Sequence, residues 1–339
     1  MKYLALALLL TTTISALGAC SAGSSGSTSS NQFVTLGRTG VTSPDGYNYT
    51  YHGSTPEISG FANQLIYVNN QFVAVGANES GLITGMVATS SNGIAFWQTQ
   101  LNYPVLNTIT YGFGKYLAGG QESTLIYSTN LSNWQQATIN PAPTASINFS
   151  AIQCNSNICY ALANRLGNGY IYSSADGINW NLVNNFTSNN PLNALAVESN
   201  TFVAVGNHGT IAYNNGSGWT QLATSPTNKQ LLGIAYGNGN FVIVGGGDAN
   251  PLLSFSQVIL QNSGNLDTWN IVYSGDEVMH TLNSVVYANN RFAVVGEGLI
   301  TILPDDTVGY STTGASGTWN LHHLATLSSS TLAYGTVSY

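Results

Sequence analysis

Short, mostly apolar runs, each led by an aromatic residue, recur along this chain between polar stretches. Two or three apolar or small residues follow the aromatic one, and a glycine or alanine closes the run. The seven copies occupy residues 33–37, 72–76, 116–119, 160–163, 202–206, 241–245 and 292–296. Aromatic and β-branched residues favour strands, and a repeat of about 40–50 residues is typical of a radial array of small sheets. The spacing predicts an all-β fold, a seven-bladed β-propeller.

Two further phrases accompany each run in a fixed order. An apolar phrase precedes it and is expected to form the innermost strand, at residues 64–67, 106–109, 150–153, 192–195, 231–234, 282–285 and 331–334. A polar hairpin follows, at residues 43–46, 90–93, 128–130, 174–177, 214–216, 263–265 and 311–314. All six tryptophans come directly after these hairpins, and Tyr49 takes the place in the remaining copy. We expect the hairpin side chains to satisfy turn N–H groups and the tryptophans to fill the space between neighbouring sheets.

The hairpin pattern Ser-x-Asp-Gly-x-x-Trp, closest at residues 174–180, resembles the Asp-box (BNR-type) repeat. This repeat is found in the propellers of sialidases, sortilin-like receptors and photosystem assembly factors. The resemblance covers residues 32–339 and implies the propeller architecture, without carrying over an activity.

The two ends of the chain contain incomplete copies of the repeat. The first copy begins at the second-strand run, residues 33–37, and has no innermost strand before it. The last copy, residues 331–339, is an innermost strand with nothing after it. Together they make one four-stranded blade, which removes the open edges of the ring. We therefore expect one of the seven blades to be split between the N- and C-terminal segments.

The N-terminus has the pattern of an export signal. In residues 1–19, Lys2 precedes an apolar run and small residues follow, as in a secretion signal. Residues 17–20, Leu-Gly-Ala-Cys, resemble the bacterial lipoprotein signal, which implies a diacylglycerol on Cys20. Ordinary secretory cleavage near Ala19 is the alternative. Ser21 stands where an aspartate would favour the inner membrane, so we expect lipid anchoring to the bacterial envelope at the outer membrane.

Three segments follow from these patterns: a lipoprotein signal peptide at residues 1–19, a lipidated cysteine with a Gly/Ser-rich tether at 20–31, and the propeller at 32–339. Only 6% of the residues are charged, with 6 Lys and Arg against 13 Asp and Glu. A nucleic-acid partner is not expected, because phosphate binding needs clustered cations. We expect a partner in the cell envelope, a protein or a glycan, and no cofactor.

The cysteines and histidines suggest little metal chemistry. Cys154 and Cys159 bracket a turn, where a hairpin brings them within disulfide reach, and export makes oxidation the expected outcome. Two free thiols are the alternative. A metal site at this pair would need further ligands nearby. His322 and His323 are adjacent, and we expect a solvated loop pair because successive strand residues face opposite sides.

The strand order assigns the loops to two faces of the ring. Loops after the second and fourth strands share one face, and most of the few charges fall there. Polar groups around the mouth of a propeller channel make this face the candidate binding face. Its candidate residues are Arg38, Glu79, Glu122, Arg165, His208, Asp248 and Glu297.

A non-catalytic binding role in envelope assembly or adhesion fits this face best, centred on Arg38, Arg165 and Glu122. Glycan binding or a sialidase-like glycoside hydrolase is the alternative. The sialidase resemblance would imply three arginines around a carboxylate, but Arg291 follows an innermost strand and falls on the opposite face. Two carboxylates suffice for other glycosidases, so acidic residues on this face leave that class open.

Overall fold

The computed structural model describes residues 29–36, 40–52, 58–247, 256–262, 264–275, 280–298, 306–324 and 331–338. The expected signal segment with Cys20, and the candidate residues Arg38 and Asp248, lie outside these ranges. For Glu297 only the backbone is described. Within these ranges no helix is long and apolar enough to cross a membrane.

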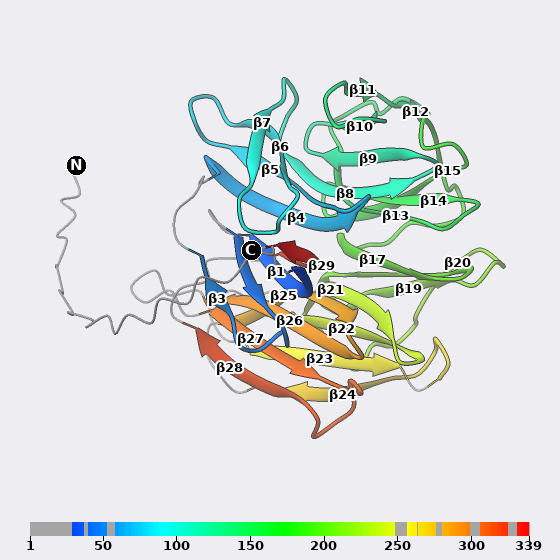
Figure 1. Ribbon diagram of the computed structural model, residues 1–339. Coiled ribbons are helices and arrows are strands. Elements are labelled where there is room, and N and C mark those ends of the chain that lie inside the picture. Colours follow the sequence, from blue (N-terminus) through cyan, green and yellow to red (C-terminus); the bar gives the residue numbers. More distant parts are fainter. Residues whose placement is uncertain are drawn as a thin grey trace, which may run out of the picture.

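Seven small sheets stand in a ring (Figure 1), and we number the blades along the chain. Blade 1 contains β1 (Ser29–Leu36), β2 (Gly40–Ser43), β3 (Thr50–Tyr51) and β29 (Leu332–Ser338). Blade 2 contains β4 (Gly60–Val68), β5 (Gln71–Asn78), β6 (Thr84–Ser90) and β7 (Trp97–Gln100). Blade 3 contains β8 (Leu106–Gly112), β9 (Lys115–Gly120), β10 (Leu125–Ser128) and β11 (Gln135–Gln136). Blade 4 contains β12 (Thr138–Asn140), β13 (Asn148–Cys154), β14 (Cys159–Arg165), β15 (Asn168–Ser174) and β16 (Asn179–Leu182).

The remaining three blades have four strands each. Blade 5 contains β17 (Leu192–Glu198), β18 (Thr201–Gly206), β19 (Ile211–Asn214) and β20 (Trp219–Gln221), with the 3-10 turn η1 (Asn207–Gly209) between β18 and β19. Blade 6 contains β21 (Gln230–Gly237), β22 (Asn240–Gly246), β23 (Gln257–Asn262) and β24 (Trp269–Ser274). Blade 7 contains β25 (His280–Ala288), β26 (Arg291–Gly298), β27 (Asp306–Ser311) and β28 (Asn320–Leu324).

The two ends of the described chain meet in blade 1 (Figure 1). β29 pairs antiparallel with β1, from Ser338 opposite Ser29 to Leu332 opposite Thr35. The predicted seven-bladed β-propeller is confirmed, and its first blade is built from both terminal segments. Because β1 begins at Ser29, the last residues of the expected tether 20–31 lie in a strand.

Blade 4 has a fifth strand that the repeat did not predict. β12 follows β11 of blade 3 in the chain but pairs in parallel with β16, from Thr138 opposite Asn179 to Asn140 opposite Asn181. The side-chain amides of Asn140 and Asn181 add a 3.0 Å hydrogen bond. The outer edges of blades 3 and 4 are therefore joined by backbone pairing as well as by side-chain packing.

A β-bulge interrupts the innermost strand at the same place in six blades. The register with the second strand shifts after Ala62, Leu106, Phe149, Leu192, Leu231 and Leu282. The bulge brings the innermost backbone against the second strand, so a Cβ on Gly76 would overlap the carbonyl oxygen of Phe61. A Cβ on Gly206 would likewise overlap the carbonyl oxygen of Pro191. Close backbone approach is the physical reason that the recurring run ends in glycine.

An aromatic pair joins the innermost and second strands at the other end of this hairpin in five blades. Its ring centroids lie 4.7–5.0 Å apart, in the pairs Phe33–Tyr334, Tyr67–Phe72, Tyr111–Tyr116, Tyr236–Phe241 and Tyr287–Phe292. In blade 4 the same positions hold Cys154 and Cys159, which lie opposite each other and form a disulfide. The disulfide therefore occupies the place of an aromatic pair.

The register in blade 4 corrects the sequence alignment of that copy. We expected Tyr160 to lead its run, but Cys159 is the residue that corresponds to Phe72. Tyr160 is one position later, so its ring faces the next blade and contacts Phe202 at 4.8 Å and Trp219 at 5.2 Å. Because Tyr160 directly follows Cys159, the sequence alignment placed this copy of the run one residue too late.

The polar hairpins have the hydrogen bonds that their sequence predicts. Ser174 Oγ accepts hydrogen bonds from the backbone N–H groups of Asp176 and Gly177, and Asp176 Oδ1 accepts from Ile178 and Asn179. The tryptophans differ more than expected. Trp180 is fully buried between sheets, whereas Trp97 is 70% exposed. The expectation that every tryptophan fills an inter-blade space is wrong for Trp97.

Candidate functional site

The ring has two faces, defined by the loops that each carries. Face 1 carries the turns after the first and third strands of a blade, and face 2 carries the loops after the second and fourth strands. On face 2, Glu79 lies in the β5–β6 loop and Glu122 in the β9–β10 loop. Arg165 ends β14, and His208 lies in η1. These four candidates lie on one face of four consecutive blades, as the repeat phase predicted.

The four side chains are brought to one face but not into one cluster. Glu79, Glu122 and His208 are exposed and Arg165 is half-buried. Within the described ranges no hydrogen bond or ion pair joins any two of them. The same ranges contain no group of three or more His, Cys, Asp and Glu side chains that could hold a metal ion. The arrangement suits contact with a broad partner surface rather than a compact catalytic centre.

Arg291 lies on face 1, where it supports the contact between blades 7 and 1. Its Nη1 donates a 3.0 Å hydrogen bond to the carbonyl oxygen of Asp45. Its guanidinium carbon lies 5.2 Å from the ring centroid of Tyr310, in a cation–π contact. Arg291 and Arg165 are therefore on opposite faces of the ring.

A groove of about 430 Å³ lies on face 2 beside Glu122. Tyr103 and Pro104 line it together with residues that follow β11, among them Ile139 and Pro143. The backbone fixes its rim, because Ser123 N–H donates to the carbonyl oxygen of Ile147 at 2.7 Å. The groove is thus bounded by the links from blade 2 to blade 3 and from blade 3 to blade 4.

Large apolar side chains are exposed on face 2 in blades 2 and 4, the blades that flank this groove. Leu82 is 86% exposed and Ile83 is 65% exposed, both in the β5–β6 loop. Gly85, just after this loop, donates a 2.7 Å backbone hydrogen bond to Tyr103 of the groove wall. Leu166, in the β14–β15 turn of blade 4, is 87% exposed. Sequence reasoning weighed the charges of face 2 and missed these apolar residues.

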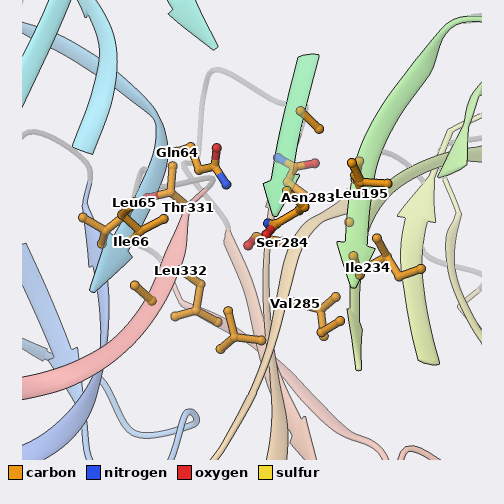
Figure 2. A pocket seen from close by; sticks show the side chains of 18 of the residues that line it. Gln64, Leu65, Ile66, Leu195, Ile234, Asn283, Ser284, Val285, Thr331 and Leu332 are labelled. Carbon is orange, nitrogen blue, oxygen red and sulfur yellow. The ribbon is translucent and has the colours of Figure 1, made fainter. Parts of the chain in front are cut away.

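The second concave feature is the central channel, about 610 Å³ in volume (Figure 2). It is lined by the innermost strands, and none of its described lining residues is charged. Figure 2 shows Gln64 and Asn283 reaching into the space between these strands, with Leu195 and Ile234 on the wall. The channel therefore combines amide groups with aliphatic walls.

The bulges place a polar ring at the face 2 end of the channel. Four of the six bulged residues donate a side-chain hydrogen bond to the innermost strand of the next blade. Asn63 donates to the carbonyl oxygen of Leu106 at 2.8 Å, and Asn193 donates to that of Leu231 at 2.9 Å. Asn107 donates in the same way to the carbonyl oxygen of Phe149, and Ser150 donates to that of Leu192. At the corresponding position blade 6 has Leu232, which has no polar side-chain atom to donate.

The sequence contains a signal for this ring. Asparagine is the second residue of the phrases at 106–109, 192–195 and 282–285. An asparagine at one phase of an otherwise apolar strand indicates a specific hydrogen bond, because an unpaired amide there is unfavourable. The bulge itself is not visible in the apolar pattern.

Two hairpin aspartates on face 1 have strongly shifted pKa values. Desolvation opposes the ionisation of Asp176, but hydrogen bonds from Asn179, Ile178 and Ser174 outweigh it and lower its pKa from 3.8 to about 2. Asp45 has the same balance of desolvation and hydrogen bonding, and its pKa also falls to about 2. Both carboxylates hold their hairpins together, so their shifts indicate a structural role.

The histidine pair lies in β28, which corrects the expectation of a solvated loop. His322 is opposite Val308 and His323 is opposite Thr307, so the two side chains face opposite sides of the strand. The ring of His322 lies 3.9 Å from that of Tyr47 in blade 1. Burial is the main cause that lowers the pKa of His322. His322 therefore belongs to the contact between blades 7 and 1, whereas His323 lies on the other side of the strand, with its Nδ1 3.4 Å from Thr307 Oγ1.

Comparisons with known proteins support the architecture. A structure of YCF48 bound to D1 peptide is similar with a TM-score of 0.55 and 14% identity, over 79% of this chain and 82% of that one. The WD40 β-propeller domain of Doa1 is similar with a TM-score of 0.57 and 12% identity, over 84% of this chain and 90% of that one. At these identities the similarity shows the propeller fold alone. Neither a protein-family model nor a curated protein matches the sequence.

Proposed function

We propose that this chain is an exported, lipid-anchored propeller that binds a protein partner of the cell envelope through face 2, without catalysis. The observation that carries the proposal is the exposed apolar surface beside the groove. Leu82 and Ile83 are adjacent, protrude at a loop tip and leave most of their surface in water. Clusters of exposed apolar residues beside a groove are typical of protein interaction sites.

The chemistry of the groove indicates the kind of segment that it would take. Tyr103, Pro104 and Pro143 offer rigid apolar contact, and Glu122 places an exposed carboxylate on the rim. We expect an extended partner segment with apolar residues and a nearby cation. YCF48, a propeller of similar fold, has been solved with a peptide bound, which supports a peptide-like partner segment for a scaffold of this shape.

Removing the apolar loop tip tests the docking surface. Fully burying a leucine or isoleucine contributes about 1.5–3 kcal/mol, so Leu82→Ser with Ile83→Ser should weaken partner binding by tenfold or more. The assay is quantitative recovery of the partner with the tagged full-length protein from its own envelope. Trp97→Ser, which removes an equally exposed apolar side chain on face 1, is the matched control. Equal recovery by the loop variant and the wild type would contradict the proposal.

The charged residues of the same face give an independent test. Arg38→Ala with Arg165→Ala should abolish partner recovery and leave the melting temperature nearly unchanged. Undiminished recovery by this double variant would show that the two arginines do not contribute to the binding surface. The Leu82→Ser with Ile83→Ser variant would still test the apolar contact.

Lipid anchoring rests on the sequence of residues 17–20. If Cys20 carries the acyl chains, Cys20→Ala should move the protein from the membrane fraction to the soluble fraction, because several acyl chains are needed for stable anchoring. Mass spectrometry of the mature N-terminus gives the second readout. An unmodified Cys20 in the wild-type protein would contradict the anchor.

A further inference from the structure

We propose that the central channel is a second binding site, specific for a small neutral polyhydroxylated ligand such as a monosaccharide. This site is separate from the face 2 surface, so its success or failure does not bear on the partner proposed above. Its volume of about 610 Å³ is in the range of small-molecule pockets. Side-chain amides around the channel, some of whose polar atoms have no partner in the described protein, indicate this class of ligand.

Four side-chain amides around the channel each use one polar atom, the oxygen or the nitrogen, in a hydrogen bond within the protein. The other polar atom of each amide is available to a ligand. Asn63 and Asn193 use Nδ2 for the bonds to the next blade. Gln64 Oε1 accepts a 2.7 Å hydrogen bond from the backbone N–H of Ile109, and Asn283 Oδ1 accepts one of 2.9 Å from Thr281 Oγ1. These bonds fix the orientation of each amide group.

The remaining amide atoms have no protein partner within the described ranges. Oδ1 of Asn63 and of Asn193 are left as acceptors, while Nε2 of Gln64 and Nδ2 of Asn283 are left as donors. All four residues are half-buried and line the channel. A hydroxyl group can both donate and accept, so vicinal hydroxyls match a wall that presents both. Because the amides are already held in place, little side-chain entropy is lost on binding.

The walls select against charge and favour a ligand with an apolar face. No described lining residue carries a charge, and an unpaired charge in such a channel would lose hydration without a counter-ion. Leu195, Ile234 and Val285 form aliphatic wall that can pack against the C–H face of a sugar ring. Neutral sugars therefore fit the channel better than their charged analogues.

Calorimetric titration of the full-length protein, in a detergent without a sugar headgroup, tests the site. The probes are glucose, galactose, mannose, N-acetylglucosamine and myo-inositol, with glucuronate and glucosamine as charged counterparts. At least one neutral probe should bind in the millimolar range or tighter, and its charged counterpart should bind at least tenfold more weakly. Binding of none of the neutral probes, or preference for a charged one, would overturn the proposal.

Two channel variants locate the binding. Asn283→Leu removes a free donor, and Leu232 shows that leucine is accommodated at this bulge position. This variant should lose at least tenfold in affinity. Ala194→Phe, which fills the channel from blade 5, should abolish binding, whereas Asn157→Ala on face 1 should leave it unchanged. Wild-type affinity in both channel variants, with unchanged melting temperatures, would show that the sugar binds elsewhere.

Discussion

Replacing the disulfide of blade 4 by an aromatic pair tests whether the blades are interchangeable. Cys154 and Cys159 occupy the positions that Tyr67 and Phe72 occupy in blade 2. The space for a ring is present, because Gly112 of blade 3 lies against Cys154, as Gly237 of blade 6 lies against the ring of Tyr287. The double variant Cys154→Tyr with Cys159→Phe should therefore fold with a tilted aromatic pair, like Tyr67–Phe72, in place of the disulfide.

The expected free energies follow from the loop length and from the aromatic contact. The disulfide spans a sequence separation of 5 residues, for which the chain-entropy model gives about 2 kcal/mol. The double variant Cys154→Ala with Cys159→Ala should lose this amount together with the packing of the sulfur atoms. An aromatic pair in contact contributes about 0.5–1.5 kcal/mol beyond its buried area. The Tyr/Phe variant should thus recover most of the loss seen in the alanine variant.

Urea unfolding of the full-length protein, with and without a reductant, measures these differences. The wild type should lose about 2 kcal/mol of unfolding free energy on reduction, while neither double variant should respond to the reductant. If the Tyr/Phe variant is no more stable than the alanine variant, the correspondence between the disulfide and the aromatic pairs is wrong.

Two further predictions concern the bulge ring and the hairpins. Asn193→Ala leaves the carbonyl of Leu231 without its side-chain donor, so it should lower the unfolding free energy by about 1–3 kcal/mol; Asn283→Ala, which breaks no inter-blade bond within the described ranges, should lower it by less. The stability contributed by ionised Asp176 is present above pH 3.8 and is lost as the pH falls towards 2. Asp176→Asn should flatten the unfolding free energy in this window, and an unchanged slope would contradict the assigned role.

The fold was largely predictable because its signal is repeated. One aromatic-led run gives only a short strand, but seven copies at a similar spacing specify a ring of small sheets. The phase of the copies also placed Glu122 and Arg165 on one face and Arg291 on the other. The number of blades and the face of each loop both follow from the number and order of the repeated strands, and the apolar pattern gives these correctly.

The register within each blade was not predictable in the same way. A β-bulge inserts one residue without changing the apolar character of the strand, so our innermost-strand phrase at 64–67 begins two residues after Ala62, the position that corresponds to Leu106. The exposure of Trp97 and Leu82 depends on what neighbouring blades leave uncovered. This exposure depends on the assembled ring and cannot be predicted from the local sequence.

Site-specific photo-crosslinking in cells, within the proposed envelope setting, shows directly whether face 2 binds a protein partner. A photoreactive residue replaces Leu82 or Leu166 on face 2, and Asn157 or Asn215, both exposed on face 1, in matched variants. Binding through face 2 should give one discrete adduct with the same partner from both face 2 positions and none from the face 1 positions. Adducts with that partner from face 1, or no adduct from either face 2 position, would contradict it.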